Sequence, residues 1–520
     1  MADRAQPLGF AGWAGIAVAT AIPAFIGITA VAVVLSAEGG RGLSAADWAA
    51  VRFTLWQALL SALISVALAI PVTRALARRR FWGREALITL LGAPFLLPVI
   101  VAVFGLLAIF GRGGLINAGL AQVGVAPISI FGLHGVILAH VFLNLPLATR
   151  LLLQGWQTIP AERFRLAASL NMGPSAILRH LEAPMLLRAV PPAALVIFVI
   201  CTTSFAVALT LGGGPRATTV ELAIFQALRF DFDLARAAML SAVQLVITGA
   251  TALFALQWAT TSEFGKGLDR LPRRWDASDL PRRAVDGMLI AGAALFVIAP
   301  MAAVFLRGIW TITDLPAVVW TSAGRSLVVA VISTALVLTG AIAMAIAAAR
   351  LRRGARWIES AGLLAIAASP LVLGTGLFVI VFPFIEPSRL ALPVTALINA
   401  LVTMPFALRV LIPAVRDVEA AHGPLADSLG LVGWARMQLL VLPRIRRPLG
   451  FSAGLAAALS MGDLGVVALF ADPETATLPL QLYRLMGAYR MDEAAGASLL
   501  LLMLSLLLFW ACDYGGRRGA

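Results

Sequence analysis

The sequence predicts an all-α polytopic membrane protein with about 12 transmembrane helices, arranged as two tandem homologous halves of six. Three observations lead to this fold class. Hydrophobic residues make up 60% of the 520 residues and charged residues 13%, with a mean hydropathy of +0.93, whereas soluble domains are about 45–50% apolar. Apolar runs near the ~20 residues that cross a bilayer recur along the chain. A polar stretch of one type also occurs twice.

The repeated polar stretch sets the period of the duplication. Its first copy is 160–184, PAERFRLAASLNMGPSAILRHLEAP, and its second copy is 419–443, EAAHGPLADSLGLVGWARMQLLVLP. The offset is 443 − 184 = 259 residues, which is close to half of 520. Pro146 and Pro405 show the same offset, since 405 − 146 = 259. We therefore expect two parallel halves related by an axis along the membrane normal, with the pathway between them.

The expected spans follow from apolar windows of membrane-crossing length. Between the halves lies a stretch with Lys266 and five arginines, which is too polar to cross a bilayer and is predicted to be a cytoplasmic linker. The expected domains are residues 1–260, the linker 261–286, and residues 287–520. The expected helices are 11–35, 55–77, 86–110, 132–153, 187–211 and 234–256 in the first half, and 288–306, 326–348, 358–384, 393–412, 451–470 and 494–511 in the second.

The basic residues predict which loops are cytoplasmic, because cytoplasmic loops hold the excess of Lys and Arg. The net charge of +14 falls in alternate short loops and forms no continuous basic domain, so nucleic acid is not an expected partner. Both termini are predicted to be cytoplasmic. The clusters that mark the cytoplasmic side are at Arg78, Arg79, Arg80 and Arg84, at Arg163, Arg165, Arg179 and Arg188, at Arg350, Arg352, Arg353 and Arg356, and at Arg444, Arg446 and Arg447.

Each copy of the polar stretch is expected to form a short helix, a break and a second short helix. Asn171 can adopt the left-handed conformation that ends a helix, and Pro174 can start the next one. Gly430 takes the place of Asn171 in the second copy. Such a knob, held at the membrane face by its flanking spans, suits a groove on a partner protein. The alternative is an amphipathic linker in the headgroup region.

In these stretches the chain resembles the membrane-spanning permease subunits of bacterial binding-protein-dependent ABC importers. Their cytoplasmic loop carries Glu-Ala-Ala, then a glycine after three intervening residues, and Ile-x-Leu-Pro, with the glycine and proline thirteen residues apart. Here the corresponding distances are 184 − 171 = 13 and 443 − 430 = 13. The matching positions are Arg165, Leu166, Ala167, Asn171 and Pro184 in the first copy, and Pro424, Leu425, Ala426, Gly430 and Pro443 in the second.

The resemblance implies a type I ABC importer permease in the bacterial inner membrane. Each polar loop would seat in one subunit of a homodimeric ATPase on the cytoplasmic side, and closure of that dimer would turn the pathway outward. The chain has no G-x-x-x-x-G-K-[ST] phosphate loop, so it is not expected to be an enzyme or to hold a cofactor. ATP and Mg would bind to the partner ATPase, and a periplasmic binding protein would deliver the substrate.

The fused two-by-six arrangement resembles the permeases for thiamine and for ferric iron. Stretches such as GLHGVILAHVFLNLPLATRLLLQ from Gly132 and MGDLGVVALF from Met461 favour thiamine and its phosphates. Ferric iron is the alternative cargo. A secondary transporter would need ion or proton sites near the midplane, and a membrane enzyme has the least support because no nucleophile–base set or paired carboxylates occur in a polar loop.

Asp463 is the one carboxylate well inside an expected span, and its counterpart at the 259 offset is Ser204. A charge there costs at least ~2.5 kcal/mol, so it should face the bundle interior or water. One hypothesis is that Asp463 offsets the positive charge of a thiazolium ring that passes between the halves. The alternative is that it caps a helix or bonds to a neighbouring span.

Four more residues are candidates for the substrate pathway. His140 and Asn144 lie four apart on one helix face, where polar groups usually hold helices together. Phe225 and Tyr483, at nearly the repeat offset, could stack on a cation or anchor span ends at the interface. Cys201 and Cys512 lie in apolar segments and suggest neither a disulfide nor a metal site. No catalytic residue is predicted.

Overall fold

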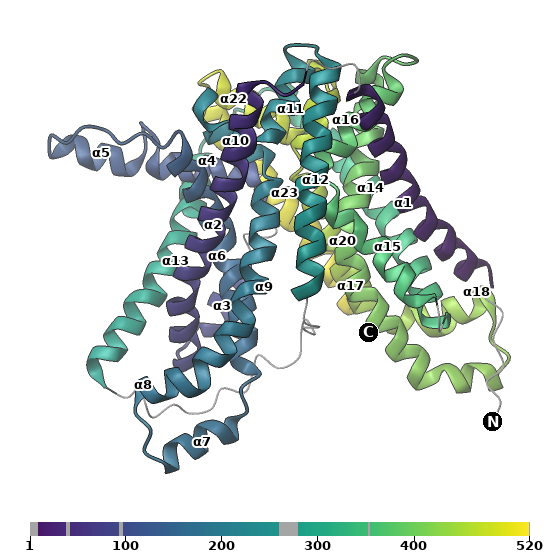
Figure 1. Ribbon diagram of the computed structural model, residues 1–520, viewed down its shortest axis with the longest axis horizontal. Coiled ribbons are helices and arrows are strands. Elements are labelled where there is room, and N and C mark those ends of the chain that lie inside the picture. The colour runs from purple at the N-terminus through teal and green to yellow at the C-terminus, as the bar shows by residue number, and fades with distance from the viewer. Residues whose placement is uncertain (1–8, 38–41, 93–96, 259–278, 352–353, 519–520) are drawn as a thin grey trace.

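The computed structural model describes residues 9–37, 42–92, 97–258, 279–351 and 354–518, which form helices and no β-strand (Figure 1). Within these residues, 11 helices are long and apolar enough to cross a membrane, and the count rises to 12 if one bent pair forms a single span. The predicted all-α polytopic fold with about 12 spans is therefore confirmed.

The first half supplies six spans and several short helices. The capping box of Ser44 and Asp47 starts α2, with the Ser44 backbone N–H donating to the Asp47 carboxylate over 2.9 Å. The elements are α1 Gly9–Ala37, α2 Ala45–Arg78, α3 Arg84–Gly92, α4 Val99–Phe110, α5 Leu115–Gln122, α6 Leu133–Gln157, α7 Ala161–Ser169, α8 Pro174–Ile177, the π-helix η2 Leu178–Glu182, α9 Ala183–Thr202, α10 Phe205–Leu211, the 3₁₀ turn η3 Pro215–Ala217, α11 Val220–Arg229 and α12 Leu234–Trp258.

The second half repeats this order. Its α16 begins at Pro370, where Ser369 accepts hydrogen bonds from the backbone N–H groups of Leu371 and Val372. The elements are α13 Leu280–Gly308, α14 Ala317–Arg350, α15 Ala355–Ala367, α16 Pro370–Val381, η4 Pro387–Leu390, α17 Ala391–Ser428, α18 Gly433–Arg436, the π-helix η5 Met437–Val441, α19 Leu442–Arg444, α20 Arg446–Met461, α21 Gly465–Phe470, η6 Pro473–Thr475, α22 Leu478–Gly487 and α23 Met491–Arg518.

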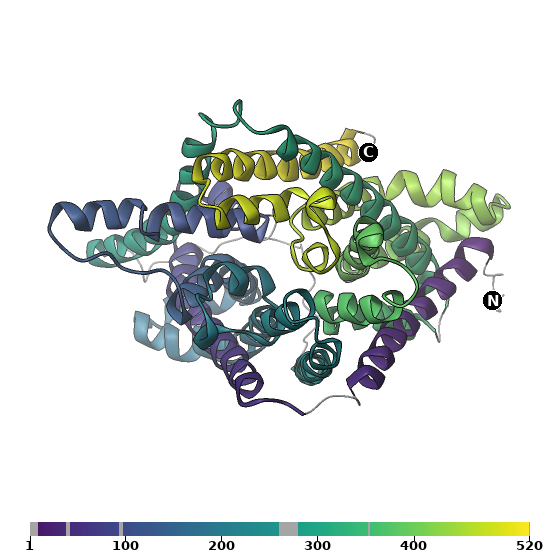
Figure 2. The same cartoon turned by 90° about the horizontal axis from the view of Figure 1, so that it is seen from above.

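The first helix of each half packs against the other half. α1 packs against α14 and α16 of the second half, and α13 packs against α2 and α4 of the first; Figure 2 shows α1, in purple, beside the green helices. A Cβ added to Gly105 on α4 would lie 2.7 Å from the Pro300 carbonyl oxygen on α13, and one added to Gly376 on α16 would lie 2.6 Å from that of Thr29 on α1. Since 376 − 105 = 271 and 300 − 29 = 271, both halves make the same close contact.

An ion pair between α2 and α13 strengthens this packing between the halves. Arg79, at the end of α2, donates through Nε to Asp286 of α13 over 2.8 Å, and the Asp286 side chain is 7% exposed. The predicted second domain was to begin at residue 287, but α13 begins at Leu280, so that boundary falls inside a helix. Residues 261–278 of the predicted linker lie outside the described residues.

The repeat offset is not constant along the chain. α14 starts 317 − 45 = 272 residues after α2, whereas the polar stretches are 259 apart. The difference lies between α4 and α6, where 133 − 110 − 1 = 22 residues contain α5, compared with 391 − 381 − 1 = 9 between α16 and α17. α5 projects sideways from the bundle in Figure 1, so the first half carries an extra arm that the second lacks.

Four expected spans are broken. The windows 86–110 and 358–384 each contain two helices, and Pro98 and Pro370 stand at the start of the second one, α4 and α16, where a proline needs no partner for a backbone N–H. The windows 187–211 and 451–470 are also divided, into α9 and α10 and into α20 and α21. Conversely, the window 393–412 is only part of α17, which runs on through Ser428.

Candidate functional site

The two copies of the polar stretch have the same backbone conformation, and we call them the two coupling elements. The first consists of α7, α8 and η2, and the second of the end of α17, α18 and η5; both lie at the lower edge of Figure 1. Asn171 and Gly430 have φ of 47° and 64°, so both adopt the predicted left-handed conformation. The π-helices start 437 − 178 = 259 residues apart.

A proline follows each π-helix and explains the wide turn. Pro184 and Pro443 cannot donate a backbone hydrogen bond. The N–H before each proline instead reaches one residue further back, from Ala183 to the Leu178 carbonyl and from Leu442 to the Met437 carbonyl. The thirteen-residue spacing that singled out these two prolines did not predict the π-helix.

The outer face of each element is apolar at equivalent positions. Leu166 and Leu170 are 60% and 65% exposed, and their counterparts Leu425 and Leu429 are 58% and 64% exposed. The spacing of four places each pair on one helix face. The remaining predicted coupling residues differ in exposure. Exposed are Arg165, Asn171, Pro184, Pro424 and Gly430; Ala167 and Ala426 are buried, and Pro443 is half-buried.

The interior of the first coupling element is apolar. Phe164 and Ile177 are 3% and 0% exposed and belong to one core cluster with the spans above them. Beside them, Glu182 is fully buried and pairs with Arg74 of α2 at 2.7 Å. The indole N–H of Trp156 also donates to Glu182 over 3.5 Å. Packing and the Arg74–Glu182 ion pair therefore hold the first element against its bundle.

The interior of the second coupling element is an ion-pair cluster. Arg436 is buried and donates to Glu419 and to Asp427. Burial lowers the pKa of Arg436, but its hydrogen bonds to Glu419 and Asp427 outweigh this and raise it. Arg436 occupies the place of Ile177, since 436 − 177 = 259, and Gly423 the place of Phe164, since 423 − 164 = 259.

The glycine in the second element makes room for the arginine. A Cβ on Gly423 would lie 3.2 Å from Nη2 of Arg436 and 3.3 Å from Oε2 of Glu419. The ion pair of the first element also has an apolar counterpart, because Val441 and Ile346 stand where Glu182 and Arg74 would be and both are buried. Positions that are apolar in one element are thus charged in the other, and the reverse, although the two elements have the same backbone conformation.

The broken spans supply the candidate pathway residues Ser204 and Asp463. In the first half the last carbonyls of α9 are capped by two glutamines: Gln57 of α2 donates to the Cys201 carbonyl over 2.8 Å, and Gln244 of α12 donates to that of Thr202 over 2.9 Å. Ser204 precedes α10 without a side-chain cap. The glutamines satisfy carbonyls that the break leaves without helical partners.

In the second half, the break has a carboxylate beside the helix that follows it. The carboxylate of Asp463 lies beside the backbone N–H groups of Gly465, Val466 and Val467 at the start of α21. Its Oδ2 atom has no hydrogen-bond partner within the described residues. The position agrees with the capping alternative for Asp463, and the free oxygen leaves the hypothesis of substrate contact open.

The two breaks meet between the halves. A Cβ on Gly465 would lie 3.6 Å from Cδ1 of Phe205 and 3.9 Å from Oδ1 of Asp463. Phe205 follows Ser204 directly, so residues that are far apart in sequence come together where the two broken spans adjoin. Breaks in membrane helices expose polar backbone groups where a substrate can bind.

His140 and Asn144 lie inside the first bundle. His140 Nδ1 is 3.1 Å from the Ser61 hydroxyl, and the Asn144 amide donates to the His140 carbonyl over 2.9 Å and contacts Cys201 Sγ at 3.4 Å. In the second half Asn399, Thr403 and Ser460 occupy the same places; the Thr403 hydroxyl donates to the Asn399 carbonyl over 2.7 Å, and the Asn399 amide donates to the Ser460 hydroxyl over 3.1 Å. These contacts support a role in holding helices together, and a role in substrate contact has no geometric support of its own.

Phe225 and Tyr483 come together on the opposite side of the molecule from the coupling elements. Both line one pocket, with Phe225 on α11 and Tyr483 on α22. Phe225 and Tyr483, which we paired because they lie at nearly the repeat offset, therefore line the same pocket although they belong to different halves.

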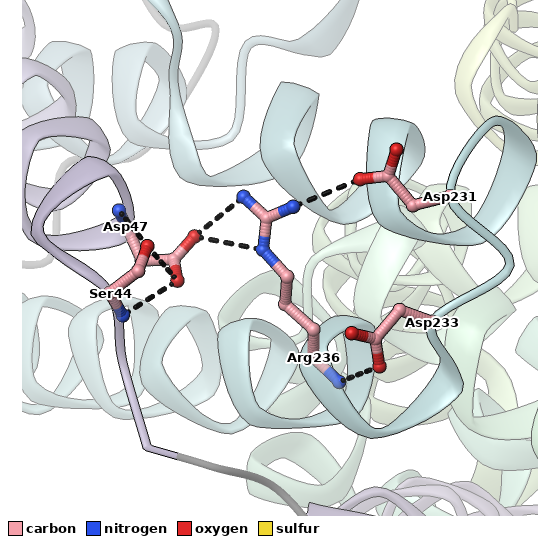
Figure 3. Close-up of polar contacts among 5 residues, drawn as sticks. All are labelled: Ser44, Asp47, Asp231, Asp233 and Arg236. Carbon is pink, nitrogen blue, oxygen red and sulfur yellow. Dashed lines mark hydrogen bonds and ion pairs between the residues drawn. The ribbon is translucent and has the colours of Figure 1, made fainter.

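An ion-pair cluster ties the outer ends of α2 and α12 together (Figure 3). Arg236 donates from Nη2 to Asp47 over 2.9 Å and from Nη1 to Asp231 over 2.9 Å, and its backbone N–H donates to Asp233. Sequence reasoning missed this cluster. Its signal was the concentration of Asp231, Asp233 and Arg236 in and just after the loop before α12, but the partner Asp47 is 189 residues away.

The chain is similar to known transport permeases over most of its length. The thiamine transport system permease protein ThiP of Salmonella typhimurium is 39% identical over 535 residues, covering 98% of this chain and 97% of that protein. ThiP of Escherichia coli is 41% identical over 474 residues, covering 89% and 88%. The molybdenum transport system permease protein ModB of Mycobacterium bovis is 29% identical over 241 residues, which are 45% of this chain but 90% of that protein. No family model matches the chain.

Proposed function

This chain belongs to the family of thiamine transport permeases, the membrane subunits of ABC importers, and from that premise we propose that it carries thiamine across the inner membrane between its two halves. It is a multi-pass membrane protein and a permease subunit that works with an ATPase and a substrate-binding protein. We further propose how the ATPase is coupled and where the substrate passes.

The observation that carries the proposal is the pair of coupling elements. Their common backbone, with left-handed Asn171 and Gly430 and matched exposed leucines, presents the same apolar surface twice on one side of the molecule. Two equal surfaces suit two copies of one subunit, so we assign them to a homodimeric ATPase that binds the ATP and Mg. ATP-driven closure of that dimer would then draw the elements together and reorient the halves.

The substrate would pass between the halves at the two adjoining breaks. Ser204 and Asp463 flank this place, and Oδ2 of Asp463, which has no partner within the described residues, offers one acceptor. Its negative charge suits a positively charged ring. Asp463→Asn is expected to slow thiamine uptake if the charge matters, and unchanged uptake would limit Asp463 to its capping role.

The orientation follows from the coupling elements. The start of α1 lies against α18, and Gly450, at the start of α20, packs against Gly516 near the end of α23, so both ends of the described chain lie on the side of the coupling elements. We assign this side to the cytoplasm, consistent with its clustered arginines. The opposite side, with α10, α11 and α22, would then receive a periplasmic binding protein.

Reconstitution tests the proposal. The permease is purified with its candidate ATPase and placed in liposomes with the binding protein, and uptake of labelled thiamine is measured with ATP inside. We expect ATP-dependent uptake that is lost when the phosphate-loop lysine of the ATPase is replaced. Uptake that persists without a working ATPase would indicate a secondary transporter. A binding protein that takes ferric ion but no thiamine would indicate the iron alternative, which the similarity to ThiP does not favour.

A further inference from the structure

The pocket that Phe225 and Tyr483 share is a candidate binding site on the outer side of the molecule. It has a volume of about 190 Å³ and is lined by α10, α11, the glycine turn between them and Tyr483 of α22. These elements lie at the end of the molecule opposite the coupling elements (Figure 1). Because Tyr483 belongs to the second half and the other lining residues belong to the first, the pocket changes shape when the halves move relative to each other.

Equivalent anchors place the two aromatic residues. The backbone N–H of Val220, at the start of α11, donates to the Thr54 hydroxyl over 2.9 Å, and that of Leu478, at the start of α22, donates to the Ser326 hydroxyl over 2.8 Å. Phe225 and Tyr483 each lie five residues beyond these anchors. The two rings are therefore counterparts that enter one pocket from the two halves.

The lining suits one flat heteroaromatic ring without a negative charge. Phe225, Phe230 and Tyr483 supply aromatic surface, while Thr218 and Gln226 supply uncharged hydrogen-bonding groups. The described lining contains no charged side chain, so neither a phosphate nor a metal ion has a charged partner there. A cavity of about 150 Å³ accommodates benzene, and the pocket is therefore large enough for one substituted ring.

The glycine turn keeps this space open. Gly213 and Gly214 have φ of 72° and 121°, a conformation that side chains other than glycine rarely adopt. A Cβ on Gly213 would lie 2.9 Å from the Cβ of Phe131. Substitution there would push the turn away from α6 and reshape the pocket wall.

An aromatic chain connects the pocket with the two breaks. The ring of Phe225 meets the ring of Phe230 at 5.7 Å and the ring of Phe205 at 5.2 Å, both edge to face. Phe205 in turn adjoins Gly465 beside Asp463. Phe225 thus separates the pocket from the break region by a single aromatic layer.

We propose that this pocket is an outer subsite that holds the aminopyrimidine ring of thiamine before it passes Phe225 and Phe205 to the breaks; this rests on the proposed thiamine function. The amide of Gln226 can both donate to and accept from an aminopyrimidine edge. The thiazolium ring fits less well, because the lining holds no carboxylate and Arg484 directly follows Tyr483. A transit site must also bind weakly enough to release its ligand, which suits a small pocket.

The first experiment measures binding of ring probes to the permease–ATPase complex in nanodiscs without binding protein. Saturation-transfer NMR is recorded with 4-amino-2-methylpyrimidine and, separately, with a methylated thiazolium salt. We expect the pyrimidine to bind in the millimolar range, and Tyr483→Leu or Phe225→Leu to weaken it about 2- to 10-fold. Tyr483→Phe, which keeps the ring, should retain most of the binding.

The control is Phe378→Leu on α16, which removes a ring that packs against Phe470 outside the pocket. It should leave probe binding unchanged. Equal loss in Phe378→Leu, stronger binding of the thiazolium probe, or no pyrimidine binding by the unaltered complex would each overturn the subsite.

Uptake in proteoliposomes separates failure of the subsite from failure of the function. If the unaltered importer transports thiamine and both leucine variants transport it at the same rate and half-saturation, the subsite is wrong and the function stands. If the unaltered importer transports no thiamine, the function itself is wrong. Size-exclusion profiles and basal ATPase activity of each variant show whether it has folded.

Discussion

The two coupling elements share a backbone but not an interior. Both have a left-handed residue, a π-helix before a proline and an exposed leucine pair. Beneath this surface, Phe164 and Ile177 form an apolar core in the first, whereas Gly423 and Arg436 admit an ion-pair cluster in the second. A partner protein contacts only the exposed residues of each element. The comparison therefore indicates that docking requires the same surface on both elements, while two different sets of interior contacts can stabilise that surface.

The difference also predicts different sensitivities. An apolar core depends on filled volume, and an ion pair depends on both partners and on the ionic strength around the exposed one. Asp427 has a side chain that is 44% exposed, whereas Glu182 of the first element is fully buried. Changes that create cavities should therefore affect the first element more, and changes in charge or salt should affect the second more.

The largest expected effect is that of Phe164→Ala. Removing a buried phenylalanine costs about 3–5 kcal/mol, so the first element should loosen and ATP-dependent uptake should fall strongly. Hydrogen exchange of residues 161–182 measures the loosening directly. Leu166→Ala, at an exposed position of the same helix, is the matched control and should leave exchange nearly unchanged. Equal exchange in both variants would contradict a core role for Phe164.

Arg436→Ala should have the next largest effect. Removing one partner of a buried ion pair costs about 3–5 kcal/mol, and the cost here should be smaller because water reaches Asp427 and part of Glu419. Exchange of residues 419–441 should rise while that of residues 161–182 stays constant.

Salt sharpens this second test. Raising the ionic strength should increase exchange in the second element of the unaltered protein more than in the first, because the Asp427 side chain is 44% exposed, whereas Arg74 and Glu182 of the first element's ion pair are 24% and 0% exposed. An identical salt response of both elements, or none in either, would contradict the ion-pair interior.

Gly430→Val tests the shared backbone. A β-branched residue at φ of 64° is strained by about 1–3 kcal/mol, so the break should shift and uptake should fall while the spans stay folded. ATPase activity that no longer responds to substrate-loaded binding protein would show the uncoupling. Normal uptake in this variant would count against the coupling role.

Asn171→Gly should have the smallest effect. Both residues tolerate the left-handed conformation, and the change gives the first element the residue that the second already has. Uptake within about twofold of the unaltered protein is expected, since an exposed substitution of this kind typically shifts stability by less than about 0.5 kcal/mol. A loss as large as that of Gly430→Val would mean that the two breaks differ in role.

Much of the fold could be predicted because it depends on local patterns. Apolar length indicated the spans, and residue types that favour left-handed turns indicated Asn171 and Gly430. The constant offset of the polar stretches also revealed the duplication. The offset of 272 between α2 and α14 was missed although Arg78, Arg80 and Arg84 recur at it as Arg350, Arg352 and Arg356, because these basic clusters were used only to assign the cytoplasmic loops.

What could not be predicted depends on partners that are distant in sequence. Arg74 and Glu182 are 108 residues apart, and Gln57 and Cys201 are 144 apart. A lone glutamine in an apolar span was a usable signal, since its amide must find a partner there, but the partner itself follows only from the packing of α2 against α9. The exchange of α1 and α13 between halves likewise leaves no mark on either helix alone.

The most direct test of equal docking is cross-linking of Leu166→Cys and Leu425→Cys, each alone, to the ATPase. Cys201 and Cys512 are first replaced by serine; Ser460 already occupies the counterpart of Cys201. A short bifunctional reagent is applied to the assembled importer, and the linked peptides are identified by mass spectrometry. We expect both cysteines to link to the same region of the ATPase subunit. A link from only one cysteine, or links to two unrelated regions, would contradict equal docking.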